Sequence, residues 1–208
     1  MTKPILTDRL FFNRCVRNIL DCYKRATRSE VRQGLTWYSK AKRDCQHVAS
    51  DYDMRLRHVV GVVAATSPNL RWEKNVHTAT QVIDGFNAGL PHDELPSCMA
   101  YKANRLKGYH VLNSSNRSAA IMKVLRGPKV SAFFDNIMGG DSVTIDGHAR
   151  NIAYAERVNL KADAANISKK EYTALADAYR KAAAQIGIKA CDLQAVTWTV
   201  WRREHGIA

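Results

Sequence analysis

Two short segments of the chain carry the residue types best suited to chemistry. The first is Leu125-Arg126-Gly127-Pro128-Lys129, a glycine-containing turn that offers backbone N–H groups and a lysine. The second is Val143-Thr144-Ile145-Asp146-Gly147-His148-Ala149-Arg150, in which Asp146 follows the lysine by seventeen residues. Backbone N–H groups at a helix start bind phosphate well, and a carboxylate one helix away could act on a bound strand. The pair predicts a DNA enzyme that holds the backbone beside a reactive acid.

The elements that must position these residues are helices. Apolar residues recur with helical spacing, and the only β-like run is Val143-Thr144-Ile145. Helices are expected at 7–26, from Ser29, at 36–49, 54–66, 73–86, 101–113, 117–125 and 130–137, from Thr144 or Asp146, and at 169–185 and 192–205. The helix 54–66 is the most apolar and should form the centre of the core. The pattern predicts an all-α fold of about ten helices.

The length and composition allow one helical unit with two lobes. A chain of 208 residues with 46% hydrophobic content can bury a full core. We expect a single unit over residues 1–208, with one lobe at about 55–140, including a hairpin at 117–137. The second lobe combines about 1–54 with 141–208, and a cleft separates the two.

The charge of the chain favours a polyanionic partner. The 32 Lys and Arg residues outnumber the 19 Asp and Glu residues, which gives a net charge of +13. The excess is largest in residues 1–60, at +7, and falls to +4 in 61–140 and +2 in 141–208. Release of counterions from phosphates would turn this charge into affinity for nucleic acid. The alternative is that the charge serves only solubility.

Cysteine usage and hydropathy indicate a cytoplasmic protein. The five cysteines are scattered, without a C-x-x-C pair, so neither a disulfide framework nor a zinc site is expected. The N-terminal residues lack the apolar run of about 7–15 residues that marks a signal peptide. No stretch reaches the ~18 apolar residues of a membrane span. We expect a soluble, nucleoid-associated protein with no membrane partner.

The order of the segments resembles the helix-hairpin-helix (HhH-GPD, endonuclease III-like) superfamily of DNA glycosylases. A buried helix, a Ser-containing loop and an Ala-rich helix of that superfamily are similar to 58–67 with Asn75 and Thr78-Ala79. Its Lys-Ala helix resembles 101–107. Its hairpin, Leu-x-Gly-x-Gly-x-Lys-Thr-Ala, resembles 125–132, and Val-Asp-Thr-His-Val-x-Arg resembles 145–150. The resemblance spans residues 55–160 and implies a two-lobed helical bundle with a DNA-binding cleft between the lobes.

The resemblance also implies roles for individual residues. Asp146 falls on the essential aspartate, which stabilises the positive charge of the sugar or assists the nucleophile. Lys129 falls on the lysine that attacks C1′ in members with lyase activity, a reaction that needs a neutral amine. Asn69 corresponds to the side chain that fills the space of a flipped base. The expected phosphate contacts are Gly127, Pro128, Val130 and Ser131.

Four further residues are candidate DNA contacts with ordinary alternatives. Trp72, next to Arg71, could stack on a base or cover the core. His148 could be a buried structural histidine, and Arg150 could pair with a carboxylate instead of DNA. The chain departs from the superfamily at the hairpin, which has one glycine instead of two and is a residue shorter, and at Gly147, which replaces a threonine. Only Cys191 follows Asp146, so no iron–sulfur cluster, other metal or cofactor is expected.

The resulting hypothesis is excision of a modified or damaged base from double-stranded DNA by a monomeric glycosylase, with AP lyase activity if Lys129 is a nucleophile. One alternative is a base-modifying transferase on the same scaffold, which displaces a group at the 5-methyl position of a flipped, 5-substituted thymine. The shortened hairpin and the missing iron–sulfur cluster make the chain similar to glycosylase-like proteins of bacteriophages that hypermodify thymine. Another is a DNA-binding module without chemistry. The sequence does not specify which base is recognised or whether the context is repair or phage DNA modification.

Overall fold

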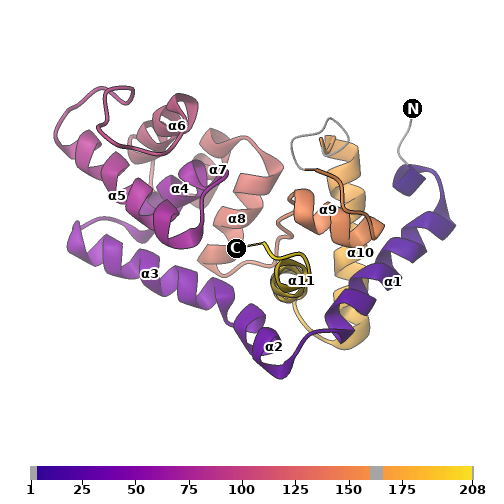
Figure 1. The fold of residues 1–208 in the computed structure, drawn as a ribbon. Coiled ribbons are helices and arrows are strands. Elements are labelled where there is room, and N and C mark those ends of the chain that lie inside the picture. Colours follow the sequence, from indigo (N-terminus) through magenta and orange to yellow (C-terminus); the bar gives the residue numbers. More distant parts are fainter. Residues whose placement is uncertain (1–3, 160–165, 208) are drawn as a thin grey trace. The chain divides into compact units, whose positions relative to one another are not determined.

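The structure, a computed structural model, describes residues 4–159 and 166–207 and is helical throughout. These residues form a short 3-10 helix, η1 (Pro4–Leu6), and eleven α-helices, without a strand (Figure 1). The helices are α1 (Arg9–Lys24), α2 (Arg28–Leu35), α3 (Trp37–Asp51), α4 (Leu56–Thr66), α5 (Trp72–Asn87), α6 (Lys102–Leu112), α7 (Ser118–Leu125), α8 (Pro128–Met138), α9 (Gly147–Tyr154), α10 (Lys169–Ile186) and α11 (Ala190–Glu204). The all-α prediction is confirmed. None of the described helices is both long and apolar enough to cross a membrane.

Local capping explains where several helices begin. The Asp8 side chain accepts a hydrogen bond from the Leu10 N–H and caps α1, close to the start expected for the helix 7–26. At α2 the cap is Thr27, not the expected Ser29, and Thr27 and Glu30 form a reciprocal capping box. Helix α8 begins at Pro128, two residues before the predicted start, because proline suits the first position of a helix.

The chain divides into two compact units. Unit 1 comprises residues 1–38 and 141–208, and unit 2 comprises residues 39–140. The expected lobe boundary at residue 140 coincides with the end of unit 2. The other boundary differs, since the sequence assigned residues up to 54 to the discontinuous lobe, whereas α3 belongs to unit 2 from Ser39 onward.

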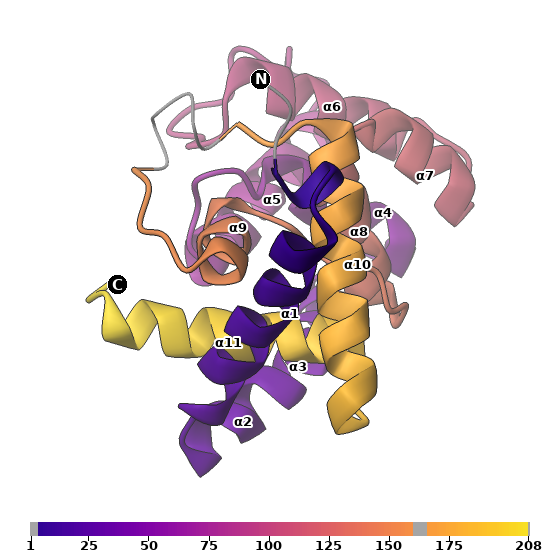
Figure 2. The ribbon, with the colours of Figure 1, turned by 90° about the vertical axis from the view of Figure 1, so that its right-hand side faces the viewer.

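Unit 1 has a core in which α1 packs against α9, α10 and α11 (Figure 2). Ile19, Leu175, Tyr179 and Leu193 are fully buried in this core. Helix α2 lies against α11, and this approach depends on Gly34. A Cβ at Gly34 would lie 2.6 Å from the backbone N and Cα of Val196.

Unit 2 is arranged around α4. This helix contacts α5, α6, α7 and α8, and its residues from Val59 to Thr66 are all buried. Figure 1 shows α4 among these four helices. The most apolar helix of the sequence is therefore the centre of a core, as predicted, and that core holds α7 and α8 in place.

Candidate functional site

The candidate residues form two groups, one in each unit. Unit 2 contains Asn69, Arg71, Trp72 and the residues of the turn between α7 and α8. Unit 1 contains Asp146, His148 and Arg150, all at the first turn of α9 or just before it.

The α7–α8 turn consists of Arg126 and Gly127, and Arg126 has an unusual backbone conformation. Arg126 ends α7 in the left-handed region, with φ 58° and ψ −15°, where its N–H donates to the Met122 carbonyl at 3.1 Å. A left-handed residue at this position of a helix end is most often glycine, since a Cβ makes the conformation costly. The exposed Arg126 side chain therefore occupies a position that is favourable for glycine.

The start of α8 presents donors and a cation to solvent. Gly127 is the N-cap and accepts the first helical hydrogen bond from the Ser131 N–H at 2.9 Å. The N–H groups of Lys129 and Val130 lie in the first turn, where helix geometry supplies no acceptor, and Pro128 has no N–H. Both Pro128 and Lys129 are exposed, whereas the Val130 side chain is buried and Ser131 is half-buried. Of the predicted phosphate contacts, Val130 can thus contribute only its backbone.

Lys129 is exposed, which bears on the lyase role that the resemblance implied. A lysine nucleophile must lose its proton, and removal from water is what favours the neutral amine. Helix α8 itself supplies no such burial. The position instead suits a charged contact with a phosphate.

Trp72 is held by two neighbours within unit 2. Its Nε1–H donates to Asp44 Oδ2 on α3 at 2.7 Å, and its ring meets the Phe133 ring of α8 edge-on at 6.5 Å between centroids. The sequence left open whether Trp72 stacks on a base or covers the core, and these contacts favour the second. Arg71, the N-cap of α5, is exposed.

The loop before α5 places Asn69 beside an aromatic residue that the sequence reasoning missed. Asn69 is exposed in the left-handed region at φ 65°, and its Nδ2 donates to the Tyr101 hydroxyl at 3.1 Å. Tyr101 is 60% exposed, which is unusual for a large aromatic side chain. The sequence signal was a tyrosine directly before the Lys102-Ala103 helix, which had been interpreted only as a helix start.

Asp146 is the N-cap of α9. Its Oδ1 accepts a hydrogen bond from the Ala149 N–H at 2.8 Å, and its carbonyl accepts from the Arg150 N–H at 3.0 Å. The cap bond involves Oδ1 alone, and the side chain is half-buried. The ordinary role of an N-cap is therefore present, but it occupies only one oxygen of the carboxylate.

Two tyrosines of α10 fix the backbone around Asp146. The Tyr172 hydroxyl donates to the Val143 carbonyl at 2.7 Å and accepts from the Ile145 N–H at 3.2 Å. The buried Tyr179 hydroxyl donates to the Ala149 carbonyl at 3.2 Å. Burial, with a smaller contribution from the negative charge of Asp146, raises the pKa of Tyr172 to about 12. Tyr172 therefore stays protonated near neutral pH and keeps its donor function.

Arg150 is buried, with 5% of its surface exposed. Its Nε lies 3.6 Å from Glu171 Oε1, and its guanidinium lies 4.4 Å from the centroid of the Tyr154 ring. The Tyr154 hydroxyl donates to Glu171 Oε1 at 2.8 Å, and these contacts join α9 to α10. Pairing with a carboxylate, the alternative that the sequence left open, is what the structure has. Arg150 is thus a positioning residue of α9 in this structure.

His148 lies one residue into α9 and lines a pocket in unit 1. The ring is half-buried, and its Nδ1 is shielded from solvent without a hydrogen-bond partner among the described residues. In the described ranges 4–159 and 166–207, no three His, Cys, Asp or Glu side chains come together as a metal site.

The fold and the candidate residues define an all-α protein of two units, each with a polar helix start that carries candidate residues. The chain matches the family model of DUF7178, a family of unknown function, over residues 1–205 and belongs to that family. No curated protein matches the chain. No solved structure matches it either.

Proposed function

We propose that this protein excises a modified or damaged base from double-stranded DNA. The observation that carries the proposal is the exposed α7–α8 turn, which combines a strained Arg126 with the cation Lys129 at a helix start. A non-glycine residue in the left-handed region costs free energy, and such strain concentrates at functional positions. A DNA phosphate is the ligand best suited to two cations and free backbone N–H groups.

Asp146 is the proposed catalytic residue. When the glycosidic bond breaks, the base leaves with the bonding electrons and takes up a proton, and positive charge develops on the sugar. The carboxylate stabilises that charge or accepts a proton from the water that attacks C1′. Tyr172 and Tyr179 support the proposal because they hold the backbone on both sides of Asp146, and catalysis requires a fixed geometry.

Tyr101 and Asn69 extend the proposed DNA contact. An exposed aromatic ring and an amide at the tip of a loop can stack on a base or fill the space of a flipped one. The exposed Arg71 and Lys102, which flank this pair in the sequence, would supply positive charge for the DNA backbone, with Lys102 Nζ also 3.7 Å from Asp93 Oδ2. The lyase activity of Lys129 remains a secondary part of the proposal, because its amine is exposed.

The testing experiment compares wild-type protein with Asp146→Asn on duplexes that carry uracil, 5-hydroxymethyluracil, oxidised guanine, alkylated purines or modified phage thymines. Asparagine caps a helix as well as aspartate does, so the variant should unfold within about 0.5 kcal/mol of wild type. We expect alkali-induced strand cleavage to fall at least about 100-fold, a loss on the scale of a missing catalytic group, while DNA affinity is retained. The matched control is Asp177→Asn, an exposed carboxylate of α10 in the same unit.

The outcomes also separate the alternatives that the sequence left open. Excision at the wild-type rate in Asp146→Asn would remove Asp146 from the mechanism. An intact strand of increased mass would indicate group transfer to the base, and an unchanged strand that is still bound would indicate a binding module. A borohydride-trapped adduct that Lys129→Gln abolishes would establish the lysine as a nucleophile.

A further inference from the structure

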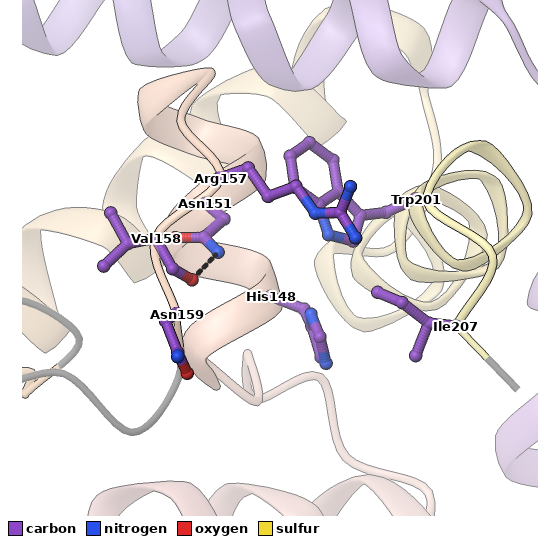
Figure 3. A pocket seen from close by; sticks show the side chains of 7 residues that line it. All are labelled: His148, Asn151, Arg157, Val158, Asn159, Trp201 and Ile207. Carbon is purple, nitrogen blue, oxygen red and sulfur yellow. Dashed lines mark hydrogen bonds between the residues drawn. The ribbon is translucent and has the colours of Figure 1, made fainter.

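A pocket of about 380 Å³ lies entirely within unit 1 (Figure 3). One wall is formed by His148 and Asn151 of α9 and by Arg157 and Val158 of the segment that follows. The opposite wall is formed by Trp201 of α11 and by Ile207. The volume is in the range of pockets that take small organic ligands, roughly 300–1,000 Å³.

Among the described residues, the lining combines the Arg157 guanidinium and the His148 ring with amide side chains, and none of these lining residues is a carboxylate. Arg157 is exposed, so its guanidinium can be reached by a ligand, whereas the Nδ1 of His148 is shielded and only the rest of its half-buried ring can face one. Such a lining selects against cations and favours an anionic group, above all phosphate, which arginine binds through paired N–H donors.

The other part of the lining is apolar. Trp201 is 7% exposed and stacks on His205, with ring centroids 3.8 Å apart and planes 26° from parallel. His205 is held in turn, because its Nδ1 lies 2.9 Å from the Trp201 carbonyl. The indole plane is thus fixed, with one face covered by His205, and a ligand would meet the remaining exposed part of the ring together with the aliphatic Val158 and Ile207. A planar ring is the ligand group that such a surface accommodates.

Internal hydrogen bonds hold the walls in place. Asn151 is 2% exposed, and its Nδ2 donates to the Val158 carbonyl at 3.0 Å, as Figure 3 shows. The Arg157 Nη2 lies 3.4 Å from the His205 carbonyl, which links the two walls. These bonds fix the walls relative to each other, which limits the reorganisation that binding requires.

We propose that this pocket binds a nucleoside monophosphate unit, with its base against Trp201 and its phosphate at Arg157 and His148. Anionic and planar groups are joined in one molecule of this class, which matches the two parts of the lining. The proposal goes beyond base excision, because the pocket belongs to unit 1 and does not involve the α7–α8 turn. The nucleotide could be free or part of a DNA strand, and the experiment distinguishes these sources.

The test is calorimetric titration of the full chain with thymidine 5′-monophosphate, thymidine and inorganic phosphate, together with the other three deoxynucleoside monophosphates. We expect a monophosphate to bind at least tenfold more tightly than thymidine or phosphate alone. Arg157→Gln should weaken this binding at least tenfold, a change that an exposed side chain allows without loss of the fold. The matched control is Arg180→Gln, whose side chain pairs with Asp177 on α10 and should leave binding unchanged.

A second arm uses a short single-stranded oligonucleotide as the titrant. Loss of affinity in Arg157→Gln for both the monophosphate and the oligonucleotide would assign the pocket to a nucleotide of the strand. Loss for the monophosphate alone would assign it to a free nucleotide. The proposal would be overturned if Arg157→Gln and wild type bound all titrants equally. It would also be overturned if no monophosphate bound at concentrations up to about 10 mM. Lys129→Gln should not affect monophosphate binding, so the pocket and the proposed excision can fail separately.

Discussion

At Arg126 the backbone conformation favours glycine, whereas the proposed function requires the arginine side chain. Arg126 is left-handed at φ 58°, where glycine would cost less, and its side chain is exposed. Glycine removes the backbone strain of the folded state, and part of this gain is offset because glycine also raises the entropy of the unfolded chain. Arg126→Gly should therefore raise the free energy of unfolding by up to about 1 kcal/mol. The same change should weaken DNA binding several-fold if the guanidinium contacts phosphate.

The control for Arg126→Gly is Ala155→Gly, since Ala155 ends α9 in the same left-handed conformation at φ 54°. This variant should gain similar stability without a change in DNA affinity. Urea denaturation and fluorescence anisotropy measure the two quantities. A stability gain in both variants with DNA affinity unaltered in both would show that the Arg126 side chain has no part in binding.

A second residue-scale prediction concerns pH. A hydrogen bond from Arg25 Nε at 2.8 Å lowers the pKa of Glu204 below its ordinary value of 4.5. A carboxyl group with a lowered folded pKa contributes stability that is fully present above the unfolded pKa and is lost as pH falls through the folded pKa. Because Arg25 and Glu204 are 49% and 27% exposed, the pair should be worth only about 0.5 kcal/mol.

Glu204→Gln should accordingly lower the free energy of unfolding by about 0.5 kcal/mol at pH 7, and the difference should shrink as pH falls below 4.5. Urea denaturation across this pH range measures the effect. Glu94→Gln, an exposed carboxylate in unit 2, should show no such pH-dependent difference. A deficit of Glu204→Gln that persists undiminished in acid would assign its cause to packing instead of charge.

At the scale of elements, most of the fold could be predicted from the sequence because its signals are local. The helices expected at 7–26, 54–66 and 130–137 begin and end within two residues of α1, α4 and α8, and the apolar run of α4 identified the centre of a core. The start of α8 was missed because Gly127-Pro128 was interpreted as a turn, although proline is compatible with the first helical position.

The partners of the candidate residues could not be predicted in the same way. Tyr172 and Tyr179 reach the Asp146 segment only because α10 packs beside α9, and no local pattern marks them. The buried ion pair of Arg150 and Glu171 likewise depends on tertiary packing, because the two residues lie twenty-one positions apart in the sequence. The pocket of unit 1 was not anticipated, since its lining comes from α9, the segment after it and the end of the chain.

The contact between α2 and α11 gives an element-scale prediction. At Gly34 an added Cβ would meet the Val196 backbone at 2.6 Å, and backbone atoms cannot move aside as side chains do. Gly34→Ala should therefore destabilise unit 1 by about 2–3 kcal/mol. Gly61→Ala in α4 is the comparison, because its Cβ would meet side-chain carbons of Val111 and Ile121 at 2.6 and 2.9 Å.

Side chains can adjust, and alanine gains roughly 1 kcal/mol of helix propensity over glycine, so Gly61→Ala should cost less than Gly34→Ala. Thermal unfolding followed by circular dichroism measures both variants. If Gly34→Ala proved as stable as wild type, α2 and α11 would not approach each other as closely as described.

At the scale of the whole molecule, positive charge is shared by the two units. Unit 2 has fourteen Lys and Arg residues against eight Asp and Glu residues, a net charge of +6, and the remaining sequence carries +7. A basic balance in both units agrees with the polyanionic partner that we propose. It does not say which cations form the contacts, because charge alone acts over the whole surface.

The salt dependence of DNA binding separates contact residues from this general charge. Each phosphate contact releases counterions and adds about 0.9 to the magnitude of the slope of log affinity against log salt concentration. Lys129→Gln should reduce that slope by about 0.9 for duplex DNA of any sequence, because the exposed amine at the start of α8 is proposed to contact phosphate. Arg180→Gln removes the same formal charge from a side chain paired with Asp177 at 2.8 Å and should leave the slope nearly unchanged. Anisotropy titrations at several salt concentrations give both slopes. Equal slopes for the two variants would mean that the α7–α8 turn does not hold the DNA backbone, and the cations of the other unit would then have to supply the affinity.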